Sequence, residues 1–255
     1  MAQRRGSNGI GCRSGRLLVM VLLLVMAGAI QVAVAETVTA DQFSALSEQE
    51  FSDWISTYYR APQPELIPAF IRKAGGSGYL TREQTLPPIA GFLASFFAAH
   101  PDRVAPSLAD AKSLPSRDYQ TILVIVLVAP GFDPAKQRDR LAELDDYGNQ
   151  LLSWFLASGI YGHDKVEPIS PSALDFIWGS FLATGNAALV VPLIGVIVPP
   201  KNNKDAMVLA VSTAARWSLG SNARQHPKIL ELCKQQIPRE PPAIAAELRK
   251  IVEQE

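Results

Sequence analysis

The chain has 255 residues, 48% of them hydrophobic, and its 24 basic side chains balance its 24 acidic ones. This length allows one substantial domain or two small ones, and the charge balance argues against the basic stripe of a nucleic-acid-binding protein. Of the two cysteines, Cys12 lies in the leader described next and Cys233 remains alone, which excludes a disulfide framework.

Residues 1–35 have the pattern of a secretory signal peptide. An apolar run from Leu17 to Ile30 ends just before Ala33-Val34-Ala35, a small-x-small cleavage pattern. The run is preceded by four arginines, Arg4, Arg5, Arg13 and Arg16. It is shorter than the roughly 20 residues of a spanning helix, so we favour a cleaved signal over the alternative of a retained membrane anchor. We expect cleavage after Ala35 and a periplasmic or secreted protein.

Cleavage would change the charge of the chain. Because all four charged residues of the leader are arginines, 20 basic and 24 acidic side chains would remain, a net charge of about −4. This again predicts a protein without a nucleic-acid partner.

The first half of the mature chain reads as a series of helices. Ser47 and Glu50 form a capping-box pattern that opens the helix FSDWISTYYR. A short helix over residues 61–76 follows, ended by two glycines, and a longer one over 81–100 contains paired prolines near its start. The dipeptides His100-Pro101 and His226-Pro227 each indicate a helix end followed at once by a new helix.

Residues 115–128 contain the apolar run TILVIVLV, whose period does not separate a buried helix from a buried strand. We favour a helix, because its flanks are helix signals and no partner strand is visible. The charged stretch that follows, AKQRDRLAELDDYG, indicates a solvated helix or an ordered loop, and residues 148–160 are again helical in pattern.

Residues 170–232 predict two consecutive helix pairs. Ser170 followed by Pro171 is a strong helix start, and Gly185 with Asn186 favours a left-handed helix end. The next stretch, AALVVPLIGVIV, predicts a second helix stopped at Pro199 and Pro200. A third helix would end near residues 220–222, a fourth would start at Pro227, and the tail PREPPAIAAELRKIVEQE predicts an amphipathic closing helix.

These elements predict an all-α fold over residues 36–255, as one domain. We expect an irregular array of antiparallel helix pairs, either α-solenoid-like or closed into a compact multi-helix bundle. A faint internal echo of Phe-Leu-Ala-Ser/Thr, beginning at Phe92, Phe155 and Phe181, fits helices that each bury one face on a neighbour.

Four stretches of the chain carry a resemblance to known proteins. They are YYRAPQPELIPAFI, PIAGFLASFFAAHPDRV, WGSFLATGNAALV and AARWSLGSNARQHPKI. Together they resemble an uncharacterised family of exported, all-helical bacterial proteins without a known activity. The resemblance implies an all-α fold and a Gram-negative periplasm, and it supplies no site residues.

The main catalytic candidates are His163 and Asp164, in the connector YGHDK. A histidine beside an aspartate on a loop can act as a general base or a metal ligand. Adjacent side chains rarely point into one site, however, and no second His or Cys lies at ligand spacing. We therefore expect no metal and no cofactor, and a turn or capping role for this pair is the stronger interpretation.

Further polar groups favour structural roles. His226, with Asn222 and Arg224, could form an anion site, but its place before a proline matches that of His100 and indicates a shared turn. The acids Glu143, Asp145 and Asp146 fit a solvated face. Cys233, at an apolar helical position, fits a buried thiol.

Aromatic residues give the one candidate binding surface. Tyr58, Tyr59 and Arg60 are consecutive, so the two tyrosines cannot share one buried helix face, and we expect one of them to be exposed. The tryptophans lie at helical spacing and are expected in the core.

The absence of catalytic motifs favours a non-enzymatic protein-interaction module of the cell envelope, with another envelope protein as partner. The alternative is an envelope hydrolase that uses His163 and nearby acids. A third interpretation, a membrane-surface protein, rests on the apolar run from Ala187 to Pro200, for which burial is expected.

Overall fold

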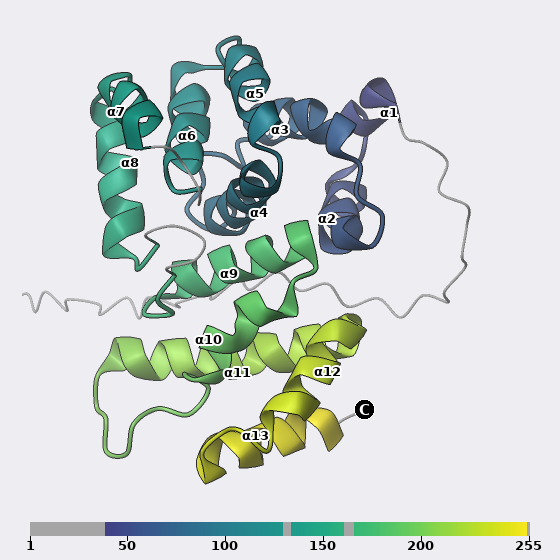
Figure 1. The fold of residues 1–255 in the computed structure, drawn as a ribbon, viewed down its shortest axis with the longest axis vertical. Helices are drawn as coiled ribbons and strands as arrows, with labels where there is room; N and C mark the ends of the chain where they lie inside the picture. The colour runs from purple at the N-terminus through teal and green to yellow at the C-terminus, as the bar shows by residue number, and fades with distance from the viewer. Residues whose placement is uncertain (1–38, 130–133, 161–165, 254–255) are drawn as a thin grey trace, which may run out of the picture. The chain divides into compact units, whose positions relative to one another are not determined.

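The computed structural model describes residues 39–129, 134–160 and 166–253, which belong to one compact unit, Ala33–Glu255. Within these residues the backbone forms α-helices and short 3-10 helices, and the only β pairing is an isolated bridge between Ile160 and Val166. The predicted all-α fold is confirmed (Figure 1).

The first eight α-helices, with the 3-10 helices η1 to η3 between them, are α1 (Ala40–Ser44), α2 (Glu48–Thr57), η1 (Tyr58–Arg60), η2 (Pro64–Leu66), α3 (Ile67–Gly76), α4 (Leu86–Ala99), η3 (Pro101–Arg103), α5 (Val104–Ala111), α6 (Ser116–Leu127), α7 (Pro134–Ala142) and α8 (Asp146–Ala157). The remaining elements are α9 (Pro171–Thr184), η4 (Ala187–Val190), α10 (Val191–Ile194), α11 (Ala206–Gln225), α12 (Pro227–Gln236) and α13 (Pro242–Glu253).

Local signals set several helix ends as expected. The Ser47 hydroxyl accepts the N–H of Glu50, and the Glu50 carboxylate accepts the N–H of Ser47, which completes the capping box. Ser170 caps α9 through the N–H of Ala173, and Gly185 ends that helix with a φ of 64°. Residues 115–128 form helix α6 and no strand.

Helices α4 and α9 cross in direct backbone contact. A Cβ atom on Gly91 of α4 would lie 1.9 Å from the carbonyl oxygen of Phe176, and one on Gly179 of α9 would lie 1.9 Å from that of Pro88. These contacts run in opposite directions along the two helices, so the pair is antiparallel. Ser180 strengthens the crossing by donating a hydrogen bond to the Gly91 carbonyl. Two helices that are far apart in the chain are thus in direct backbone contact. In an open array, by contrast, each helix contacts mainly its neighbours in sequence.

Helix α9 separates two hydrophobic cores. One face of α9, with Ala173 and Phe176, completes the core built by α1 to α6 and α8. The other face, with Ile177 and Phe181, completes the core built by η4 and α10 to α13. Figure 1 shows α9 between α4 on one side and α10 and α11 on the other. Because both faces are covered, α9 ties the two groups of helices together.

The second helix predicted over AALVVPLIGVIV is much shorter than expected. It consists of η4 and the single turn of α10, which ends at Ile194 before Gly195. Pro192 lies in the first turn of α10, where it removes a backbone donor, so a continuous helix through η4 and α10 would lose hydrogen bonds. The apolar run is nevertheless buried, as expected, through Val190, Leu193 and Ile197.

Helix α11 is longer than expected, and its tryptophan is more exposed than expected. It continues through Gly220 to Gln225, because the turn forms at His226-Pro227 and not at the glycine. Trp217, which was expected in the core, is 43% exposed on this helix. Among the described residues, no helix combines the length and the apolar character needed to cross a bilayer.

Candidate functional site

The structure separates the candidate residues of the sequence into three groups. His163 and Asp164 lie outside the described residues. Tyr58 is buried, with only 3% of its surface exposed, and packs edge-on against Phe92 and Trp54. Of the predicted binding trio, Tyr59 is half-buried and Arg60 is exposed, so only these two reach the surface.

Tyr59 joins the N-terminal helices to the C-terminal ones. Its hydroxyl lies 3.1 Å from Nδ1 of His226, at the turn between α11 and α12. The Tyr59, Phe181 and His226 rings pack against one another, with centroids 5.1–5.6 Å apart. Burial, and secondarily the nearby Arg60 guanidinium, lowers the pKa of His226 to about 4. His226 is therefore neutral at physiological pH, and its role in the contact with Tyr59 is structural.

Two cations, Arg60 and Lys228, lie beside the contact between Tyr59 and His226. Arg60 donates one hydrogen bond to the Tyr59 hydroxyl and another, 2.7 Å long, to the carbonyl of Gln225. Lys228, on the first turn of α12, donates to the carbonyl of Gly185 and lies over the Tyr59 ring. Lys228 is thereby fixed at one end of a surface groove.

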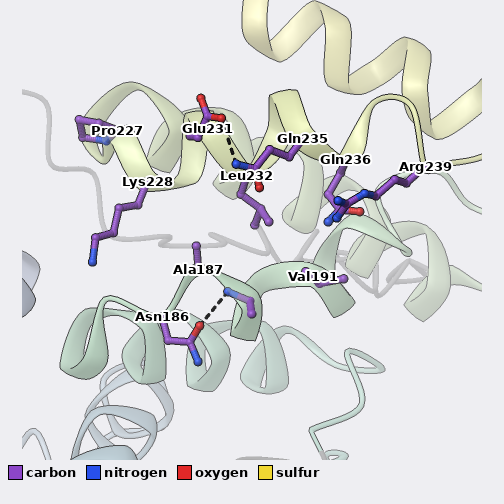
Figure 2. A pocket seen from close by; sticks show the side chains of 11 residues that line it. Asn186, Ala187, Val191, Pro227, Lys228, Glu231, Leu232, Gln235, Gln236 and Arg239 are labelled. Carbon is purple, nitrogen blue, oxygen red and sulfur yellow. Dashed lines mark hydrogen bonds between the residues drawn. The ribbon is translucent and has the colours of Figure 1, made fainter.

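This groove lies between α12 and η4, and its volume is about 740 Å³. Its walls combine apolar, amide and charged side chains: Asn186, Ala187, Ala188, Val191, Pro227, Lys228, Glu231, Leu232, Gln235, Gln236 and Arg239. Figure 2 shows Lys228 at one end, Gln236 and Arg239 at the other, and Leu232 between them, above Ala187 and Val191. A ligand in the groove would therefore meet an apolar centre between two polar ends.

The polar end near Gln236 carries unused hydrogen-bonding capacity. Gln236 is 8% exposed as a whole, and its side-chain amide, which has no hydrogen-bond partner within the described part of the chain, keeps contact with solvent. Arg239, one turn further on, forms no ion pair with any described residue. Glu231 and Gln235, in contrast, are joined by a hydrogen bond of 3.0 Å. The Gln236 amide and the Arg239 guanidinium are therefore both free to bind a polar group of a ligand at this end of the groove.

The remaining candidates have structural roles. Asp145 caps α8 through the N–H of Gly148, and Glu143 accepts a hydrogen bond from the Tyr119 hydroxyl. Cys233 is fully buried, and burial raises the pKa of its thiol to about 12, as suits an unreactive core residue.

The groove was not predicted from the sequence, although the residues of α12 carry a pattern that is consistent with it. In PKILELCKQQIPR, the polar residues Lys228, Glu231, Gln235 and Arg239 recur at three- and four-residue spacing. Such a stripe resembles any solvated helix face. What makes it a groove is η4, which packs beside α12 from a distant part of the chain.

No protein-family model, curated protein or solved structure matches the chain in the comparisons with known proteins.

Proposed function

We propose that this protein is a non-enzymatic interaction module of the cell envelope that binds a short peptide segment of another protein in the η4–α12 groove. The observation that carries the proposal is a groove whose apolar centre lies between Lys228 at one end and the unpartnered Gln236 amide and Arg239 at the other. A peptide backbone supplies both a donor and an acceptor at each residue, which is what a side-chain amide needs.

The charge of the groove favours an acidic ligand. Lys228 and Arg239 stand at its two ends, and Glu231 is its only acidic residue, so the lining carries a net positive charge. The mature chain as a whole would carry about −4. A local positive site on an acidic protein attracts a carboxylate, either an Asp or Glu side chain or a C-terminus.

The apolar centre of the groove adds a second requirement. Leu232, Ala187 and Val191 line it between the two polar ends. An apolar side chain of the ligand would be buried there, and burial of a leucine-sized group contributes roughly 1.5–3 kcal/mol. The preferred ligand is a peptide that carries an apolar residue near an acidic one.

The proposed envelope location rests on the signal-peptide pattern of residues 1–35 and on the family resemblance, and it is compatible with a groove open to other proteins.

Selection of short peptides from a random library tests the proposed function. We expect enrichment of sequences with an acidic residue near an apolar one. Calorimetric titration of a selected peptide should show that Arg239→Ala and Gln236→Leu each weaken binding about tenfold, as for the loss of one charge-assisted or buried hydrogen bond.

Lys234→Ala is the matched control, because Lys234 is an exposed cation of α12 that does not line the groove. It should bind the peptide as the unchanged protein does. Failure to enrich any peptide, or equal weakening by all three substitutions, would refute the groove as the binding site.

A further inference from the structure

Helix α11 exposes large apolar side chains that the fold leaves uncovered. Met207, Leu209 and Trp217 are 52%, 40% and 43% exposed. The other exposed large hydrophobic residues in the described part of the chain are Leu141, Leu156 and Ile169. Half of these exposed residues thus lie on one helix, as in an interaction surface.

Small residues lie between these large ones. Ala206, Ala210 and Thr213 are exposed and follow one another at four- and three-residue spacing, so they share a face of α11. The Thr213 hydroxyl donates to the carbonyl of Leu209, which satisfies it within the helix. A second helix could therefore approach this face closely without leaving a buried polar group unpaired.

The face is complementary to itself in an antiparallel arrangement. With a two-fold axis passing between Ala210 and Thr213, Ala206 of each copy lies opposite Trp217 of the other. Asp205 caps the start of the helix through Oδ1, and Arg216 lies eleven residues later, about 16 Å along the axis. Reversal of one helix brings Asp205 of each copy close to Arg216 of the other.

We propose that this face, defined by Asp205, Ala206, Leu209, Ala210, Thr213, Arg216 and Trp217, is the interface of a two-fold symmetric homodimer. A two-fold axis pairs the same patch with itself, so self-complementary charge and size are what such an interface requires. None of these residues lines the η4–α12 groove, so the proposed interface and the proposed binding site are separate.

The size of the face sets the strength of the dimer. A stable interface buries about 800 Å² on each partner, which is more than three turns of one helix provide. The dimer is therefore weak and concentration-dependent.

Sedimentation velocity of the purified protein over a range of concentrations tests the dimer. The unchanged protein should shift from monomer to dimer across the micromolar range. Leu209→Glu should keep the protein monomeric at every concentration, because it places two like charges in the apolar interface. Arg216→Glu should weaken the dimer about tenfold, by replacing two attractive pairs with repulsive ones.

Leu156→Glu on α8 is the matched control, because Leu156 is 41% exposed, close to the 40% of Leu209. It should dimerise as the unchanged protein does. Circular dichroism and thermal unfolding establish that each variant is folded. A monomer throughout the concentration range, or a dimer unaffected by Leu209→Glu, would overturn the proposal.

Discussion

Two glycines fix the distance between the central helices. At Gly91 and Gly179 the backbone of one helix occupies the space where a Cβ atom of the other would be. An added methyl group meets a carbonyl of the facing helix, which cannot rotate away as a side chain can. The crossing therefore tolerates no larger residue without separation of α4 from α9.

Gly91→Ala should destabilise the protein by about 3 kcal/mol or more, at the upper end of overpacking costs, because α4 and α9 must separate. Urea unfolding measures this free energy. Gly76→Ala is the matched control, since a Cβ atom there meets nothing within 4 Å. It should leave stability unchanged or raise it by up to about 1 kcal/mol. A Gly91→Ala protein with the midpoint of the unchanged one would contradict the observed crossing.

His226 should make stability depend on pH between about 4 and 6.5. Its pKa is lowered from 6.5 to about 4 in the folded protein, by burial and then by Arg60. In that range the unfolded chain binds the proton and the folded chain does not, so the contribution of His226 is present above pH 6.5 and is lost as the pH falls toward 4. The loss is up to about 3 kcal/mol.

The comparison variant is His226→Gln. It should be less stable near neutral pH, because the ring contacts with Tyr59 and Phe181 are lost, but its stability should fall less between pH 6.5 and 4. Urea unfolding at several pH values measures both effects. Parallel pH profiles for the two proteins would show that His226 is not held neutral by the fold.

At the scale of the elements, α9 is covered on both faces and carries an acid, Asp175. Burial raises the pKa of Asp175 from 3.8 to about 7. No described residue forms a hydrogen bond or an ion pair with this carboxyl group. A helix that serves two cores thus carries an unfavourable group at neutral pH.

Asp175→Asn should therefore stabilise the protein at pH 8, by about 2 kcal/mol after allowance for residual solvent contact. Between pH 3.8 and 7 the folded chain binds the proton more tightly than the unfolded chain, so the contribution of Asp175 to stability falls as the pH rises. The advantage of the variant should disappear near pH 4. Urea unfolding at pH 4 and pH 8 checks this, and an Asn variant that is less stable at both values would contradict it.

At the scale of the whole molecule, the sequence predicts elements better than it predicts their partners. Ser47, Ser170 and Gly185 act through their own neighbours in the chain, so their helix ends were predictable. The crossing brings together Gly91 and Gly179, which are 88 positions apart in the chain. Nothing in the sequence around either glycine distinguishes it from a helical glycine that makes no close contact. The length of η4 and α10 was mispredicted because the apolar pattern continues past the point where Pro192 and Gly195 interrupt the helix.

The same limit applies to the candidate site. The sequence predicted one exposed tyrosine without saying which, because helical spacing does not show which of Tyr58 and Tyr59 faces a neighbour. In the structure Tyr58 is buried and Tyr59 is half-buried. The groove depends on α12 lying beside η4, about 40 residues earlier in the chain. Only the positions of the folded helices reveal that Gln236 and Arg239 converge there.

Hydrogen exchange of the amide groups, measured with and without a selected peptide, tests the central claim most directly because it locates the binding site. The groove predicts added protection in α12, from Pro227 to Gln236, and in η4, from Ala187 to Val190, and a loss of that effect in Arg239→Ala. Protection at other helices instead, or the same protection in Arg239→Ala, would contradict the groove as the site of function.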